Sequence, residues 1–264
     1  MLTVVKNQIK VIILSIKYNI MRQMVNKVTF ITNILFMILN NASFIIQWII
    51  LFNIRDEIGG YNIKQITLLW GLASSVYGVS NIIFGKAFEI SDLIIKGKLD
   101  TFLVQPKNVY LSVLTSKTKI SAIGDLIYGY ICLAIYGFTI RNLALFTIFS
   151  ITGALILTAF ASIVGSFSFW IVKGDIIADS LNNAMLHFDT YPGTIFKNDV
   201  KLILYTILPV GIANYMPLDM IISFNVKNFL IVIIFTILIS ILAYTIFNRG
   251  LKKYGSSNLM SSRI

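Results

Sequence analysis

Few side chains in this sequence could carry out chemistry, because most ionisable residues lie outside its long apolar runs. The exceptions are one acidic residue within the run at 120–140 and a polar stretch at 174–190: Asp125, then Asp175, Asp179, His187 and Asp189. A carboxylate inside a membrane span is costly and by default marks a substrate or ion path. Catalysis and metal binding fit poorly, because there is one histidine and no spacing that pairs an acid with a base.

Asp125 lies near the start of its apolar run, and two explanations are open for it. It is either a functional carboxylate within the membrane or an interfacial residue that pairs with Lys117 or Lys119. We favour the ion pair, because the carboxylate is close to the end of the span where both lysines lie.

The composition indicates an all-α, polytopic membrane protein. Of the 264 residues, 57% are hydrophobic and 12% charged, whereas a soluble domain carries about 25% charged residues. The net charge of +11 arises from Lys and Arg clustered at the ends of apolar runs, which orients membrane proteins and does not indicate nucleic acid. The single Cys132 permits neither a disulfide nor a cysteine metal site within one chain.

The apolar runs predict where the chain crosses the membrane. Runs long enough for a hydrocarbon core of about 30 Å lie at 28–52, 65–88, 120–140, 143–172 and 228–248. Residues 1–27 alternate basic and apolar side chains, which predicts an amphipathic helix in the membrane interface. Residues 249–264 form a basic tail. Asn40, Asn41 and Gln47 interrupt the first span and are expected to face other helices or a water path.

Residues 174–222 allow two interpretations. In the first, 174–200 is cytoplasmic and 201–222 is the fifth span. In the second, 174–190 is a polar fifth span and 194–222 folds back as a broken helical hairpin on the outer side. The turn and break signals are Tyr191, Pro192, Pro209 and Pro217. Both interpretations give six spans within 28–248, and the excess of basic residues on one side then places both termini in the cytoplasm.

The stretch 89–119 is the largest cytoplasmic connection that we expect. Its helical pattern breaks at Gly97-Lys98 and ends at Gln105-Pro106. Apolar and charged side chains separate around these breaks, which is typical either of a segment that docks a cytoplasmic partner or of a solvated loop that follows the positive-inside rule. The apolar docking candidates would enter a partner groove and the charged ones would fix the register. These candidates are Lys98, Leu99, Asp100, Phe102, Leu103 and Pro106.

Taken together, these features resemble the ABC-2 type transporter permeases, the transmembrane subunits of bacterial ABC exporters. The likeness is to a six-span subgroup whose chains are about as long as this one, and it covers nearly the whole sequence. The first motif is Ile95-Lys96-Gly97-Lys98-Leu99-Asp100 followed by Leu103-Val104-Gln105-Pro106. The second is Tyr191-Pro192 with Ile195-Phe196, then Leu208-Pro209 with Tyr215-Met216-Pro217. Many members have Arg-Pro where this chain has Gln105-Pro106.

The resemblance implies that residues 1–264 form a single, non-catalytic permease domain in the bacterial plasma membrane. A separate ABC ATPase subunit would bind ATP and Mg²⁺ and dock on the cytoplasmic face, where 89–119 is our candidate docking segment, while this chain would bind no cofactor. Gly85-Lys86 is similar to the end of a phosphate-binding loop, but Ser80 and Ala87 replace residues that such a loop needs. A related chain or a second copy would complete a dimer.

The resemblance also implies a direction and a route. It implies export of an amphipathic peptide, drug or lipid-like compound, and it favours the outer re-entrant hairpin. The candidate translocation path is Asn40, Asn41, Gln47, Asp179 and Asn183. The alternatives are a non-transporting anchor or sensor subunit, a secondary transporter and, on weaker grounds, an enzyme acting on lipid.

Overall fold

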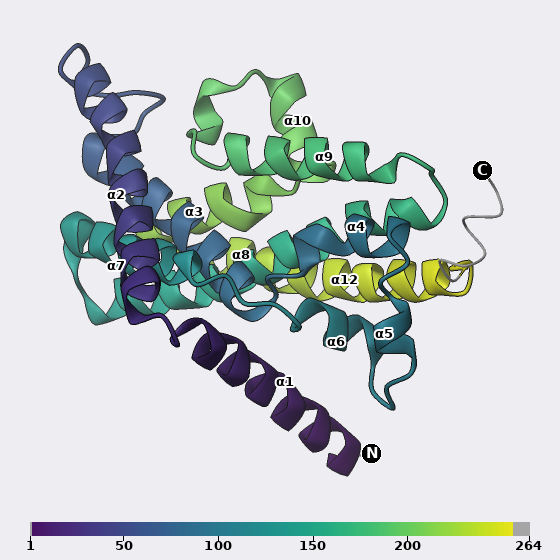
Figure 1. Ribbon diagram of the computed structural model, residues 1–264. Helices are drawn as coiled ribbons and strands as arrows, with labels where there is room; N and C mark the ends of the chain where they lie inside the picture. Colours follow the sequence, from purple (N-terminus) through teal and green to yellow (C-terminus); the bar gives the residue numbers. More distant parts are fainter. Residues whose placement is uncertain (1, 256–264) are drawn as a thin grey trace.

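The computed structural model describes residues 2–255, and within them the secondary structure is helical apart from an isolated bridge between Ile58 and Tyr61 in a turn. The apolar helices are α2 (Lys27–Phe52), α3 (Ile63–Ile83), α7 (Ser121–Gly137), α8 (Ile140–Ser166) with the 3-10 turn η2 (Phe167–Phe169), and α12 (Val226–Leu251). α8 lies in the middle of the molecule and α2 at one edge (Figure 1). The all-α expectation is therefore confirmed.

Helix length and composition define this fold as that of a multi-pass membrane protein. Four of the described helices are long and apolar enough to cross a membrane: Lys27–Phe52, Ile63–Ile83, Ile140–Phe169 and Val226–Leu251. α7 is apolar but has 17 residues. A fifth crossing is counted if Asn198–Thr206 and Gly211–Ile222 form one span, although these two parts meet at 85°.

The starts of the long helices coincide with capping side chains in the sequence. Asn26 accepts a hydrogen bond from the backbone of Thr29 at 3.1 Å and begins α2. Asn62 forms a capping box with Gln65 at the start of α3. Asn225 accepts from two amides at the start of α12. Each cap satisfies amides that a helix end leaves unpaired, which explains why these predicted boundaries were correct to within a few residues.

Small residues let α3 pack closely against both α7 and α8. A Cβ atom added to Gly129 of α7 would lie 1.9 Å from Oγ of Ser75 and 2.5 Å from the carbonyl oxygen of Gly71. A Cβ atom added to Gly153 of α8 would lie 2.5 Å from a methyl group of Val76. Larger side chains cannot be accommodated at such distances, so the small residues of these helices form contact faces.

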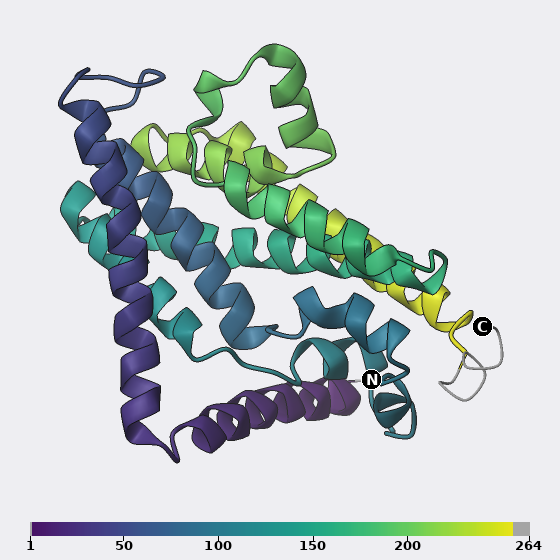
Figure 2. The same ribbon diagram turned by 45° about the horizontal axis from the view of Figure 1, so that its top comes forward.

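The N-terminal segment is a helix, as predicted. α1 (Leu2–Gln23) runs across one end of α2 rather than along the bundle (Figure 2). Ile13 and Tyr18 on α1 are 60% and 63% exposed, so an apolar surface of this helix is left uncovered by the chain itself. A position in the membrane interface stays a prediction for this helix.

Residues 174–222 form helical segments joined by breaks. They are α9 (Gly174–Phe188), the 3-10 turn η3 (Gly193–Ile195), α10 (Asn198–Thr206), the π-helical turn η4 (Gly211–Tyr215) and α11 (Met216–Ile222). Pro209 and Gly211 lie at the bend between α10 and η4, where a proline removes a backbone donor. Pro217 stands in the first turn of α11, where that donor would be unpaired anyway.

Candidate functional site

The 89–119 segment folds back on the bundle instead of forming an extended loop. It contains the end of η1 (Ala87–Glu89), then α4 (Ile90–Ile95), α5 (Asp100–Leu103) and α6 (Val109–Leu114). α3 ends at Ile83, five residues before the predicted end at 88, because Phe84 leaves the helical backbone conformation at φ −122° and ψ 35°. Gly97 ends α4 with φ +65°, a conformation that favours glycine.

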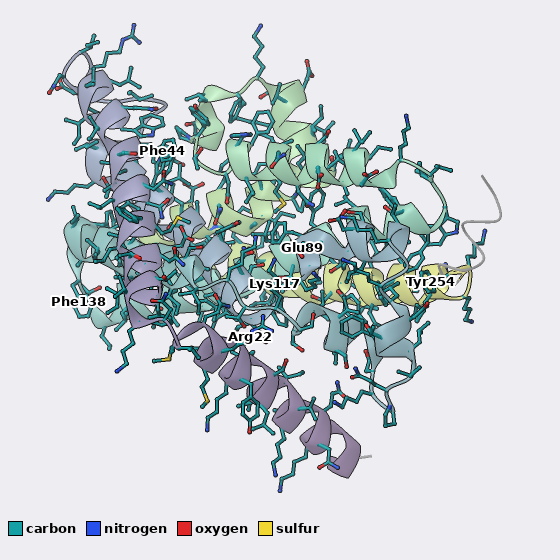
Figure 3. The ribbon with its side chains drawn as sticks, viewed as in Figure 1. Arg22, Phe44, Glu89, Lys117, Phe138 and Tyr254 are labelled. Carbon is teal, nitrogen blue, oxygen red and sulfur yellow. The ribbon has the colours of Figure 1, made fainter. Side chains whose placement is uncertain are left out.

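Two ion pairs meet at Glu89, and the pair with Lys117 joins the two ends of this segment. The Glu89 carboxylate accepts a hydrogen bond from Nζ of Lys86 at 2.5 Å and another from Nζ of Lys117, 28 residues further on. Glu89 and Lys117 lie close together in Figure 3. Partial burial would raise the pKa of Glu89, but the hydrogen bonds from Lys117 and Lys86 outweigh it and lower that pKa below its ordinary value.

The exposed tip of the segment is apolar. Leu103 is 43% and Val104 84% exposed, whereas Phe102 is half-buried against the protein's own core. Leu99 is fully buried among the protein's own side chains, so the prediction that it inserts into a partner was wrong. Its apolar neighbours in the fold occupy the surface that a partner would need.

The polar candidates of the segment differ in exposure. Lys98 and Pro106 are exposed, and Asp100 is half-buried. Tyr254, after the end of α12, lies beside Asp100, and partial burial together with that carboxylate raises the pKa of Tyr254 to about 12. The C-terminal end of α12 is therefore packed near the start of α5.

Helix α1 is joined to the same segment by hydrogen bonds. The hydroxyl of Ser15 donates to the carbonyl oxygen of Thr115 at 2.8 Å, and the amide of Asn19 donates to the same oxygen at 3.3 Å. Gln23, one helical turn after Asn19, donates to the carbonyl oxygen of Thr118 at 2.8 Å. α1 and the 89–119 segment thus form one continuous surface.

The predicted break residues of 174–222 are packed into the fold. Pro192, Pro209 and Pro217 are buried, whereas Tyr191 is 47% exposed and its ring lies 6.0 Å from that of Trp48. These contacts attach the turn after α9 to α2.

Two hydrogen bonds fasten 174–222 to the turn between α2 and α3. Oγ1 of Thr194 donates to the carbonyl oxygen of Gly59 at 2.6 Å. The hydroxyl of Tyr61 donates to Asp219 of α11 at 2.5 Å. Residues 193–219 therefore lie at the end of the bundle that carries this turn, and the 89–119 segment lies at the other end of α3.

A partly open cavity of about 340 Å³ lies between α2, α3, α7 and the end of α9, and we call it the polar cavity after the carboxylate and amide groups in its otherwise mainly apolar lining. Two carboxylates and three aromatic rings are among its lining residues, which are Met37, Asn40, Asn41, Phe44, Trp70, Ala73, Ser74, Tyr77, Asp125, Leu186, Asp189 and Thr190. Asn41 is 14 residues from the start and 11 from the end of α2, so the cavity lies near the middle of that helix.

Asp125 is bound by side chains of two neighbouring helices. Nδ2 of Asn41 donates to one carboxylate oxygen of Asp125 at 2.6 Å, and Oγ of Ser74 donates to its backbone carbonyl oxygen at 2.9 Å. The predicted pairing of Asp125 with Lys117 or Lys119 was wrong. Lys117 binds Glu89, and Nζ of Lys119 lies over the rings of Tyr77 and Phe88.

The predicted path residues are divided by the structure. Asn40 and Asn41 line the polar cavity, whereas Gln47, Asp179 and Asn183 are exposed and lie outside its lining. Asp189, at the end of the polar stretch 174–190, is buried and lines the cavity, and the side chain of Asn214 donates a hydrogen bond to it. In the sequence, the signal for this cavity is a polar residue within each helix that contributes to its lining.

The long apolar helices define a class, the helical multi-pass membrane proteins. The chain belongs to the family described as ABC-2 family transporter protein, whose family model matches residues 35–258. No curated protein and no solved structure matches the chain. Membership identifies a membrane permease component of an ABC transporter and implies association with an ABC ATPase. Such permease subunits are generally non-catalytic.

Proposed function

We propose that this chain is the permease subunit of an ABC exporter that moves an amphipathic compound across the bacterial plasma membrane. ATP hydrolysis would occur in a separate ATPase that binds ATP and Mg²⁺. A second permease, either a related chain or another copy, would complete the pathway. The exposed apolar tip at Leu103 and Val104, carried on a segment closed by the Glu89 ion pairs, is the observation that supports ATPase docking most directly.

The proposal includes six spans: α2, α3, α7, α8, α9 and α12. The turn between α2 and α3 and the hairpin at 193–222 share one end of the bundle, because Thr194 and Tyr61 bind across them. The basic 89–119 segment lies at the opposite end of α3, and the positive-inside rule assigns that end to the cytoplasm. The hairpin would then enter from the outer side, with its 85° bend between α10 and η4.

Helix α9 is the least apolar of the proposed spans. Its 15 residues extend about 22 Å, less than a hydrocarbon core of about 30 Å. It packs against α8, and Asp179 and Asn183 on its exposed side would face a partner permease or water rather than lipid. This arrangement makes α9 a helix of the dimer interface.

Purification and reconstitution test the proposed function. The chain would be produced in its native cells with an affinity tag, and the ABC ATPase that accompanies it would be identified and co-reconstituted in proteoliposomes. We expect ATP-dependent movement of a fluorescent amphiphile that stops when the ATPase carries a disabled nucleotide site. A chain that retains an ATPase but moves no amphiphile would instead support the anchor or sensor function.

A further inference from the structure

Asp125 has a carboxylate oxygen for which the described protein provides no partner. Asn41 donates to Oδ1, and Oδ2 is buried without a hydrogen bond, while the residue as a whole is 4% exposed. A buried carboxylate with an unsatisfied oxygen is costly, and the cost falls when a cation or a donor occupies the space beside it. Because Asp125 lines the polar cavity, a ligand in that cavity is such an occupant.

The charge of the cavity lining favours a cation. Asp125 and Asp189 are both in the lining, and the lining contains no Lys or Arg. Lys119 is turned toward ring faces instead, with Nζ 5.6 Å from the ring centroid of Tyr77 and 5.4 Å from that of Phe88. An anionic ligand would meet the like charge of Asp125, whereas a cationic ligand would be attracted to it.

Aromatic rings supply the second element of cation recognition. Phe44 of α2 and Trp70 of α3 stack with ring centroids 5.2 Å apart and planes 19° from parallel, and both line the cavity. Tyr77 is a third ring in the lining, but Nζ of Lys119 already lies over it. Aromatic faces attract alkylammonium groups through their quadrupole, and the attraction grows where water is excluded. The volume of about 340 Å³ is within the range of small-ligand sites.

We infer that the polar cavity binds an organic cation, an alkylammonium group attached to an apolar body, with Asp125 as its counter-ion and Phe44 and Trp70 as its aromatic walls. The inference rests on the proposed function in one respect, namely that this ligand is the exported compound. A metal ion suits the site less well, since the described residues contain no cluster of three or more His, Cys, Asp or Glu side chains able to hold one.

Direct binding to the full chain in lipid nanodiscs tests the site without requiring ATPase or transport. Isothermal titration would compare phenyltrimethylammonium with its uncharged carbon isostere, tert-butylbenzene. We expect the wild-type protein to bind the cation about tenfold more tightly than the isostere. Equal affinities, or no binding of the cation, would overturn the inference.

Variants then assign the contributions of individual groups. Asp125→Asn should weaken cation binding about tenfold and leave binding of tert-butylbenzene unchanged, while Asp199→Asn, an exposed change on α10, should alter neither. Phe44→Leu, at a residue 38% exposed, is expected to preserve the fold and weaken cation binding about threefold. Unchanged cation affinity in both cavity variants would refute the assigned roles.

The two proposals fail separately. If the protein retains its ATPase and exports an amphiphile but binds no phenyltrimethylammonium, the cation site is wrong and the exporter stands. If it binds the cation in an Asp125-dependent way but recruits no ATPase, the site stands and the export function is wrong.

Discussion

The hydroxyl of Tyr61, in the turn between α2 and α3, donates a hydrogen bond of 2.5 Å to Asp219 of α11, 158 residues further along the chain. Thr194 makes a second link from the same region to Gly59. These two bonds fix the hairpin against the first helical pair, so the mobility of 193–222 depends on them.

Tyr61→Phe should therefore loosen the hairpin without unfolding the bundle. Loss of one hydrogen bond costs about 1 kcal/mol, and hydrogen–deuterium exchange of peptides within 193–222 should accelerate correspondingly. Tyr18→Phe, at a residue 63% exposed on α1, is the matched control and should leave exchange unchanged. Unaltered exchange in Tyr61→Phe would show that the bond does not restrain the hairpin.

The proposed topology predicts which surface cysteines react from outside the cell. Cysteines replacing Asp56 and Lys197, both exposed, should react with an impermeant maleimide in whole cells. A cysteine replacing Lys107 on the 89–119 segment should react only after permeabilisation. The parent protein serves as the blank, because Cys132 is buried. Labelling at position 197 that requires permeabilisation would place the hairpin in the cytoplasm instead.

The exposed apolar tip predicts where the ATPase binds. Val104→Glu puts a charge into the contact. If Val104 is an anchor, this change should weaken ATPase binding by about 2 kcal/mol. The fold should tolerate the change, because Val104 is 84% exposed. Lys107→Ala, a nearby exposed change, should have a much smaller effect.

Phe102→Ala should also reduce ATPase retention, but it should lower thermal stability as well, since Phe102 packs against the protein's own core. Full retention by the Val104 variant would move the docking site elsewhere.

The Glu89 ion pairs predict a dependence of local stability on pH. The folded state lowers the pKa of Glu89 below its ordinary value of 4.5, so the stabilising contribution is fully present above pH 4.5 and is lost as the pH falls through the lowered pKa. Glu89→Gln should speed hydrogen exchange in 89–119 at neutral pH, and the difference from wild type should shrink below pH 4.5. Asp92→Asn is the control, because its pair with Lys96 is about half-exposed. A difference that persists at low pH would mean that the charge is not the cause.

Close packing between α3 and α7 predicts a steric limit at Gly129. Gly129→Ala places a methyl group against Ser75 and should destabilise the protein by about 1–3 kcal/mol through overpacking. Ala134→Leu adds more atoms on the exposed side of the same helix and should have little effect on thermal unfolding. Equal stability of both variants would contradict the close contact.

Sequence patterns were sufficient for the elements whose signals are local. Apolar length predicted α2, α8 and α12, which begin after the capping residues Asn26, Thr139 and Asn225. Break residues such as Pro209 indicated an interrupted helix, but the 85° bend depends on the packing of α10 and η4, which no local pattern records.

The polar cavity illustrates what local patterns do not contain. Asp125 was assigned to Lys117 or Lys119, eight or six residues away, whereas its actual partner, Asn41, is 84 residues distant. Leu99 had the right chemistry for a docking surface and is nevertheless buried. In both cases the outcome is decided by which helices become neighbours, and a periodicity within one helix carries no information about its neighbour.

Substitutions on the two sides of the junction between α1 and the 89–119 segment have different effects on its hydrogen bonds. The acceptors opposite Ser15, Asn19 and Gln23 are backbone carbonyl oxygens of Thr115 and Thr118, so exchanging either threonine leaves every acceptor in place. Replacing Gln23 by a residue without a donor removes a bond outright. Substitutions of Thr115 and Thr118 should therefore act through the packing of these buried side chains, whereas substitutions of Gln23 should act through the lost hydrogen bond.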